Sequence, residues 1–261
     1  MMTQTRYDVL AIGNAIVDVI SDADDAFIEA QKLNKGGMTL IDADRAQSLY
    51  DAMGPGREIS GGSAANTLAG LSRLGHKTAF IGQVAQDQLG DVFAHDIRAT
   101  GIDFDVPARP GQPPTARCLI LVTPDAQRTM NTFLGAAQFL PETAIDKGKI
   151  EDSAWLYLEG YLWNAPESRA AMTGAIAIAK SAGRKVALTL SDAFVVDGHR
   201  DEFFALMADG SLDLLFANDT EVRAMMQTDD TEAAVAALAQ RVPMLVCTHG
   251  AAGAEAHRGA E

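Results

Sequence analysis

The chain has 261 residues, of which 48% are hydrophobic and 21% are charged, the balance of a folded globular protein with a large core. Its formal net charge is −14 and it has no block of Lys and Arg that could follow a phosphate backbone, so nucleic acid is not an expected partner. No apolar run is long enough to cross a membrane and the first residues lack a signal-peptide core, so we expect a cytoplasmic protein without a membrane partner.

Short runs rich in β-forming residues alternate with helical stretches along most of the chain. Such a βα succession predicts a parallel sheet between two layers of helices, a three-layer sandwich of the α/β class that spans residues 1–261. Strands are predicted at residues 7–12, 78–84, 155–158, 186–190, 212–216 and 244–247, and helices at 167–182, 200–207 and 231–241.

Two regions depart from this alternation. Residues from about 27 to 42 and from 115 to 133 read as short strands joined by turn residues, such as Gly36-Gly37 and Pro124-Asp125. We expect them to pair into a small β-sheet that forms a lid over the carboxyl ends of the parallel strands, where α/β proteins bind ligands. The lid could also pair two copies of the chain into a homodimer.

The first strand is followed by Gly13-Asn14-Ala15-Ile16-Val17-Asp18. Polar groups at the carboxyl end of a strand are typical of a ligand site, and the carboxylate of Asp18 could accept hydrogen bonds from vicinal hydroxyls. A turn with Asp18 as a helix N-cap explains the same residues.

The run Gly61-Gly62-Ser63-Ala64-Ala65-Asn66 leads into a helical pattern that Gly75 ends. The paired glycines allow the close approach of a ligand, Ser63 is predicted to be the N-cap, and the amide of Asn66 could face a bound hydroxyl. Ordinary punctuation of a helix is the alternative interpretation.

Asn218 and Glu221 begin a helix after the strand predicted at 212–216. Their spacing places them on one face, where they could hold the water shell of Mg²⁺, but it is also the spacing of a capping box. The last motif, from Thr248 through Gly250 to Gly253, follows a strand and could let the backbone approach a nucleotide.

Cysteines and histidines do not indicate a metal site. Cys118 and Cys247 each lie in an apolar run, which predicts packed thiols and not a disulfide or a metal pair. The five histidines have no metal-ligand spacing, so we expect surface or loop positions for them. They are His76, His95, His199, His249 and His257.

In their order and spacing, these motifs resemble those of the ribokinase or pfkB family of kinases over essentially the whole chain. The stretch from Gly82 to Gly90 also matches, and Gly-Asn-x-x-x-Asp with Gly-Gly-Ser-x-x-Asn is more similar to the adenosine kinase branch. The resemblance implies a ribokinase-like fold. It also implies an ATP-dependent, Mg²⁺-using kinase that phosphorylates a primary hydroxyl of an adenosine-like nucleoside or a sugar.

The same resemblance implies roles for individual residues. Arg128 matches a basic lid position that faces the phosphates, although a solvated turn arginine explains it equally, and Glu159 is a further candidate for a sugar contact. The sugar would lie against Asn14, Asp18, Gly61, Gly62, Ser63 and Asn66, Mg²⁺ and its waters against Asn218 and Glu221, and the nucleotide phosphates against Thr248, Gly250 and Gly253.

One family motif is missing. The family takes its catalytic base from a Gly-Ala-Gly-Asp motif near the C-terminus, and the nearest run here, Gly250 to Glu255, matches the earlier Thr-x-Gly motif. We therefore expect the base beyond Glu261, a C-terminally incomplete kinase, and no activity from this chain alone. The alternatives are a short protein that binds a sugar or nucleoside without phosphorylating it, and a kinase for a free sugar such as ribose or fructose.

Overall fold

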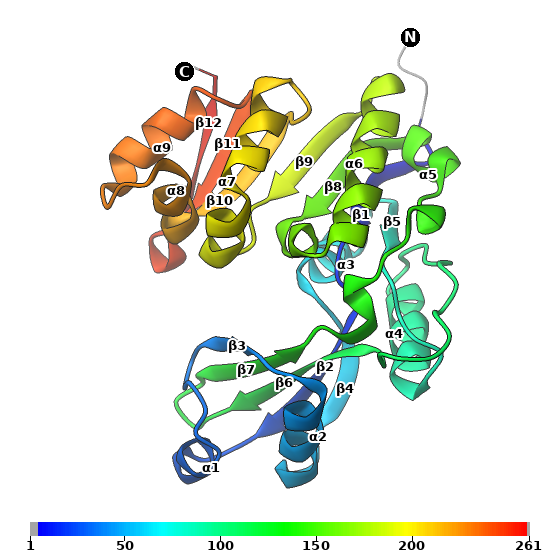
Figure 1. Cartoon of the computed structure of the whole chain (residues 1–261), viewed down its shortest axis with the longest axis vertical. Coiled ribbons are helices and arrows are strands. Elements are labelled where there is room, and N and C mark those ends of the chain that lie inside the picture. Colours follow the sequence, from blue (N-terminus) through cyan, green and yellow to red (C-terminus); the bar gives the residue numbers. More distant parts are fainter. Residues whose placement is uncertain (1–4, 260–261) are drawn as a thin grey trace.

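The computed structural model describes residues 5–259, which form a large sheet and a smaller lid sheet (Figure 1). The large sheet has the order β12-β11-β10-β9-β8-β1-β5, and every neighbouring pair is parallel except β11 with β12. Its strands are β1 Tyr7–Ile12, β5 Thr78–Ile81, β8 Ser153–Glu159, β9 Lys185–Thr189, β10 Leu214–Asn218, β11 Met244–Thr248 and β12 Ala254–Arg258.

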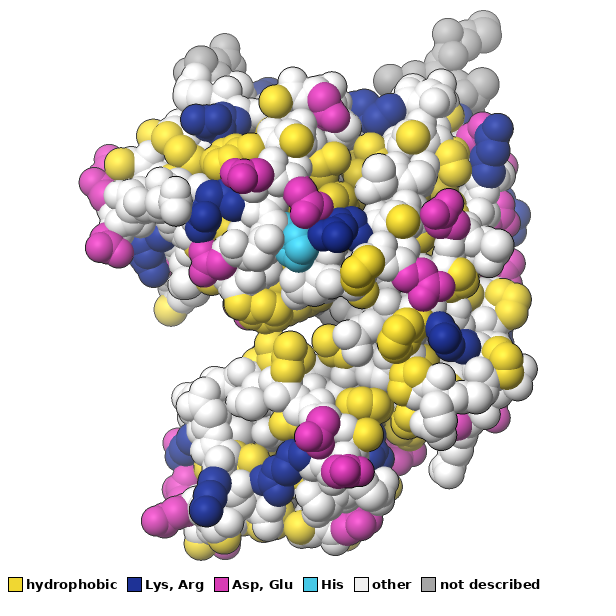
Figure 2. Space-filling model, viewed as in Figure 1, with side chains coloured by type: hydrophobic (Ala, Val, Ile, Leu, Met, Phe, Trp, Pro, Cys, Tyr) yellow, Lys and Arg dark blue, Asp and Glu magenta, His cyan; other side chains and the backbone are white. Residues whose placement is uncertain are grey.

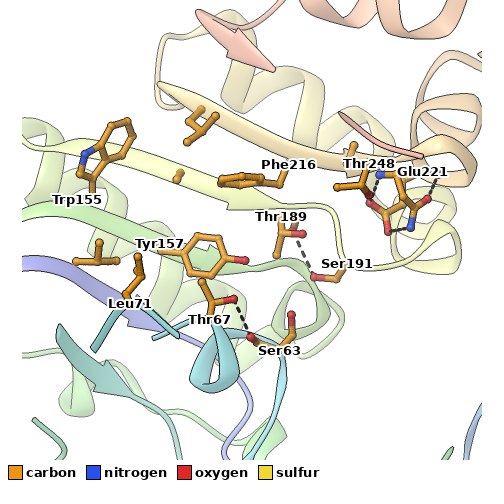
Figure 3. A pocket seen from close by; sticks show the side chains of 15 residues that line it. Ser63, Thr67, Leu71, Trp155, Tyr157, Thr189, Ser191, Phe216, Glu221 and Thr248 are labelled. Carbon is orange, nitrogen blue, oxygen red and sulfur yellow. Dashed lines mark hydrogen bonds between the residues drawn. The ribbon is translucent and has the colours of Figure 1, made fainter. Parts of the chain in front are cut away.

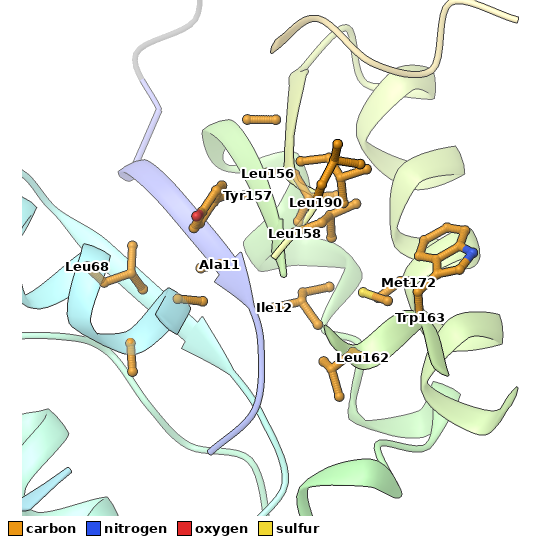
Figure 4. Close-up of a cluster of buried hydrophobic side chains, with 14 of the residues drawn as sticks. Ala11, Ile12, Leu68, Leu156, Tyr157, Leu158, Leu162, Trp163, Met172 and Leu190 are labelled. Atoms are coloured by element: carbon orange, nitrogen blue, oxygen red, sulfur yellow. The ribbon is translucent and has the colours of Figure 1, made fainter. Parts of the chain in front are cut away.

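Helices pack on both faces of the large sheet, which confirms the predicted sandwich. Leu68 of α3 lies on one side of β1, and Met172 of α6 lies with Leu156 and Leu158 on the other (Figure 4). Strands of a parallel sheet are apolar on both faces because both are normally covered. The helices of this part are α3 Ser63–Arg73, α4 Gln88–Ala99, α5 Lys147–Glu151, α6 Pro166–Ser181, α7 Ala193–Ala208, α8 Asp219–Met226 and α9 Thr231–Ala239.

One part of the large sheet has a face without a helix among the described residues. Leu215 and Leu245 are fully buried under α8 and α9, whereas Leu214 and Phe216 on the opposite face are only half-buried. The α3 helix contacts β1, β5 and β8 but does not extend over β10. An apolar strip along β9 and β10 is therefore open.

The lid sheet has the order β3-β7-β6-β2-β4, with α1 and α2 on its outer face (Figure 1). Leu119 and Leu121 pack toward these helices, whereas Ile16, Cys118 and Ile120 form a separate cluster on the inner face. Figure 2 shows a deep cleft between the lid and the large sheet, with hydrophobic side chains on both walls. The lid elements are β2 Ile16–Asp22, α1 Asp25–Ala30, β3 Met38–Leu40, α2 Ala43–Ala52, β4 Arg57–Gly61, β6 Ala116–Val122 and β7 Arg128–Phe133.

The lid differs from its prediction in two respects. Residues 25–30 form a helix and not a strand, because Asp24 caps them by accepting a hydrogen bond from Phe27 N. Strands β2 and β4 were not predicted, although they lie beside each other at one side of the sheet. The paired strands expected within 115–133 are confirmed as β6 and β7.

Most strands of the large sheet lie within two residues of their predicted bounds, but β5 ends at Ile81 and does not reach Val84. Helix α7 begins earlier than predicted, at Ala193, and its backbone is kinked at His199. Both cysteines are free and buried, as expected. Within residues 5–259, no helix has the length and apolar character needed to cross a membrane.

Candidate functional site

Two short passages join the large sheet to the lid on one side of the cleft. The outward passage, residues 13–15, joins β1 to β2, and the return passage at Gly62 joins β4 to α3. Both passages lie beside the carboxyl end of β8, because β1 and β8 are parallel neighbours. This is the edge of a parallel sheet at which ligands usually bind.

Asn14 in the outward passage is 1% exposed and is bonded to Glu159 at the end of β8. The Glu159 Oε1 atom accepts hydrogen bonds from Asn14 Nδ2 at 2.7 Å and from Asn14 N at 3.3 Å, and Oε2 accepts one from Ala64 N at 2.9 Å. Glu159 was expected to contact a sugar. Its carboxylate instead has protein donors on both oxygens and is 1% exposed.

Asp18 lies within the lid strand β2 and not in a turn after β1, so its interpretation as a helix cap was wrong. It shares the inner face of the lid with Ile16 and Ile20, because alternate residues of a strand point to the same side. Burial raises the pKa of Asp18 to about 6, and the positive charge of Arg128 acts in the opposite direction. The structure thus brings Asp18 and Arg128 within electrostatic range on one wall of the cleft.

The paired glycines leave room for two of these groups. A Cβ on Gly61 would overlap the Asp18 carboxyl group, and one on Gly62 would overlap Asn14 O. Gly62 also has a φ of 97°, a conformation that residues with a Cβ rarely adopt. Glycine at these two positions therefore allows the lid strand and the return passage to pack directly against the Asn14 and Asp18 segments.

Gly62, and not Ser63, is the N-cap of α3, so the predicted capping role of Ser63 was wrong. Ser63 is the first helical residue and lines a cavity together with Thr67. Asn66 lies in the first turn, as expected, with its N–H bonded to Gly62 O at 2.9 Å. Its side chain lines a different depression, beside Ser60 of β4.

A cavity of about 520 Å³ extends from the carboxyl ends of β9 and β10 along the open face of the large sheet (Figure 3). The apolar end of the cavity contains Trp155, Tyr157 and Phe216. The polar end contains Ser63, Thr189, Ser191, Asn218, Glu221 and Thr248.

Asn218 and Glu221 form the predicted capping box at the polar end. Asn218 Oδ1 accepts from Glu221 N at 2.9 Å, and the Glu221 carboxylate accepts from Asn218 N at 3.0 Å and from Asn218 Nδ2 at 2.7 Å. Burial raises the pKa of Glu221 to about 7, and the negative charge of Asp192 adds to this shift. The cap is thus present, and the same carboxylate lines the cavity.

Two further polar residues, Ser191 and Asp192, lie near Glu221 and were not predicted as site residues. Asp192 caps α7 and lies 3.5 Å from the hydroxyl of Tyr161, which follows the end of β8. Ser191 has a left-handed backbone with a φ of 72°, a strained conformation that is concentrated at functional sites. Polar residues directly after the strand predicted at 186–190 were the signal that could have revealed Ser191 and Asp192.

Thr248, Gly250 and Gly253 form a tight turn after β11, with φ values of 54° and 103° at the two glycines. Its His249 bonds through Nδ1 to Asp219 at 2.5 Å and lies 3.2 Å through Nε2 from Glu255. The hydrogen bond to Asp219 raises the pKa of His249, and Glu255 contributes to the increase. Cys247 also lies close to Asp219 and His249. The ion pair of His249 and the packing of the buried Cys247 thiol account for this cluster of three residues.

Comparisons with known proteins agree with this fold. Residues 8–259 match the family described as pfkB family carbohydrate kinase. The structure is similar to a probable sugar kinase protein from Rhizobium etli CFN 42, with a TM-score of 0.92 and 46% identity over 98% of this chain and 78% of that one. It is also similar to an adenosine kinase from Sinorhizobium meliloti, with a TM-score of 0.91 and 47% identity over the same shares.

A curated relative is more distant. The guanosine-inosine kinase of Escherichia coli (strain K12) is 25% identical over 256 residues. The match covers 94% of this chain but 58% of the relative, so the chain spans little more than half of that protein's length.

Proposed function

The chain belongs to the pfkB family of carbohydrate kinases, and on that premise we propose that it binds a ribose-containing, adenosine-like nucleoside as the acceptor of an ATP-dependent phosphoryl transfer. The observation that carries the proposal is the position of Asp18. It is a partly buried carboxylate on the inner face of the lid, and its backbone is continuous with the outward passage. A carboxylate held in this way can accept hydrogen bonds from two vicinal hydroxyls of a ribose.

The surroundings of Asp18 favour a nucleoside over a free sugar. Ile16, Cys118, Ile120 and Met130 form an apolar patch on the inner face of the lid. A sugar offers hydroxyls in every direction and would leave some of them unpaired against this patch, at a cost in binding. A purine base offers a flat apolar surface that the patch can cover.

The phosphate side of the proposed reaction lies at the polar end of the cavity. In-line transfer of a phosphoryl group from a nucleotide to an alcohol requires positively charged groups beside the phosphoryl group and exact placement of both reactants. Arg128 on the lid could supply one positive charge, and the turn from Thr248 to Gly253 offers backbone that a phosphate could approach.

The donor set at this end fits a hydrated Mg²⁺ ion. Glu221 and Asp192 offer carboxylate oxygens, the hard ligands that Mg²⁺ prefers. Burial raises the pKa of Glu221, and the negative charge of Asp192 is close enough to add to that rise. Glu221 and Asn218 would hold the ion through its waters. When bound, the ion would neutralise charge on the nucleotide phosphates.

Titration calorimetry on the chain tests the acceptor proposal. We expect adenosine to bind, with ribose and fructose at least tenfold weaker, because only the nucleoside can use both Asp18 and the apolar patch. Equal affinity for adenosine and ribose would favour a free-sugar kinase. Binding of nucleosides without phosphoryl transfer would favour a binding protein that does not phosphorylate.

A further inference from the structure

The two short passages on one side of the cleft meet at one buried carboxylate. Glu159 bonds to Asn14, in the outward passage, and to Ala64, two residues after the return passage. Three N–H groups therefore converge on one side chain that is 1% exposed. No other carboxylate among residues 5–259 bonds to both passages.

The packing around this carboxylate leaves little room for movement. A Cβ on Gly13 would lie 2.6 Å from Glu159 Oε2 and 2.6 Å from Ala64 Cβ. A Cβ on Gly82 would lie 2.7 Å from Gly13 O, so the segment after β5 also presses against the outward passage. Contacts this close mean that any displacement of one passage is transmitted to the other.

Polar residues of the proposed acceptor site extend from both of these passages. Asn14 is in the outward passage and Asp18 is four positions further along the chain, whereas Gly62 is the return passage. The position of the residues that follow the outward passage, relative to those of the return passage, is set where the two passages meet.

We infer that Glu159 is a positioning residue that fixes the lid and the acceptor site to the large sheet, and that it does not itself bind the acceptor. The anchoring follows from the observed contacts, whereas its effect on acceptor binding rests on the proposed function. In physical terms, the carboxylate is the common acceptor without which three buried N–H groups would be unpaired.

The variant Glu159→Gln tests this role with little change in volume. A Gln side chain offers one acceptor oxygen and turns an NH₂ group toward N–H donors, so at least one passage loses its partner. Amide hydrogen exchange of the chain without ligand should then be faster by about tenfold or more in β2 and β4, but unchanged in β9 and β10. Adenosine affinity should fall by a similar factor.

Glu202→Gln is the matched control. The Glu202 carboxylate also accepts hydrogen bonds, from Trp163 Nε1 at 2.8 Å and from Arg169 at 3.1 Å, but it lies outside both passages. Its replacement should leave exchange in the lid strands and adenosine affinity at their original values.

The alternative roles of Glu159 give different patterns. Weaker adenosine binding with unchanged exchange in the lid would make Glu159 a direct ligand and overturn the inference, as would faster exchange throughout the protein. Faster exchange confined to the lid of a protein that never binds adenosine would support the anchoring and refute the proposed function. If Glu159→Gln does not fold, Asn14→Ser removes the side-chain amide but keeps the bond from Asn14 N to Glu159, and it should give a weaker effect, also confined to the lid.

Discussion

The carboxyl group of Asp18 lies directly against the α-carbon of Gly61 on the neighbouring strand of the lid. We predict that Gly61→Ala displaces the carboxylate and lowers adenosine affinity by about tenfold, because a charge-assisted hydrogen bond is worth ~1.5–3 kcal/mol. Calorimetry measures the loss. Gly54→Ala is the control, because a Cβ there would make only an ordinary contact, 3.5 Å from Ser21 Oγ. Equal affinities for the two variants would mean that Asp18 does not bind the acceptor.

Acceptor binding should depend on the ionisation of Asp18. Because its pKa is raised to about 6, the carboxylate forms only as the pH rises through about 6, and adenosine affinity should increase over the same interval. The Asp18→Asn variant should bind at least tenfold more weakly at pH 8 and show no such increase. A wild-type affinity that is constant from pH 5 to pH 8 would contradict this prediction.

The raised pKa of Asp18 also has a cost in stability, with a defined sign. Between about pH 4 and pH 6, Asp18 keeps its proton in the folded protein but has released it in the unfolded chain. The free energy of unfolding therefore falls as the pH rises through that window. Urea unfolding at pH 4.5 and pH 7 should show this fall in the wild type and less of it in Asp18→Asn.

The capping box and the proposed Mg²⁺ role of Glu221 can be separated by Glu221→Gln. Glutamine also serves a capping box, so the thermal midpoint should change little, whereas a neutral amide should weaken binding of a hydrated divalent ion several-fold. Mn²⁺ binding in the presence of ATP, followed by electron paramagnetic resonance, measures the second effect. Glu232→Gln, in the first turn of α9, is the control. Unchanged Mn²⁺ binding would leave Glu221 with the cap alone.

His249 should stabilise the turn after β11 mainly at low pH. Its pKa is raised by the hydrogen bond to Asp219, so the stabilisation is complete below the unfolded value of about 6.5 and is lost as the pH rises through the higher folded value. We expect His249→Gln to melt below the wild type at pH 6 and close to it at pH 9. His95→Gln, at an exposed histidine beside Asp96, should melt like the wild type at both values. An equal loss for His249→Gln at both pH values would rule out the ion pair as the cause.

Residues 1–261 alone should show no phosphoryl transfer above background, even where adenosine binds. The chain has no Gly-Ala-Gly-Asp motif, and a positioned general base typically contributes about 10²–10⁴-fold to the rate. Transfer of radiolabelled phosphate from ATP to adenosine measures the rate, with Asp18→Ala as the blank. Ordinary turnover would show that residues 1–261 already contain the base.

The large sheet could be predicted from the sequence because its strands are apolar runs with helical segments between them. The run from Ile16 to Ile20 has the pattern of a strand, but nothing local shows that the chain leaves the large sheet at Gly13. For that reason β2 was not predicted as a separate strand of the lid. Helix α1 has its own signal in the cap at Asp24. The bonds from Glu159 to Asn14 and Ala64 join segments 145 and 95 residues apart, and no local pattern encodes them.

The open face of the large sheet gives the protein an internal optical reporter. Of its two tryptophans, Trp163 is 2% exposed, whereas Trp155 lines the cavity on the open face, with Lys185 Nζ 5.1 Å from its ring centre. In a Trp163→Phe background, all tryptophan emission would come from this face. Any polypeptide that covers β9 and β10 would shield Trp155 from water and shift its fluorescence to shorter wavelength, so coverage of the sheet can be followed without a label.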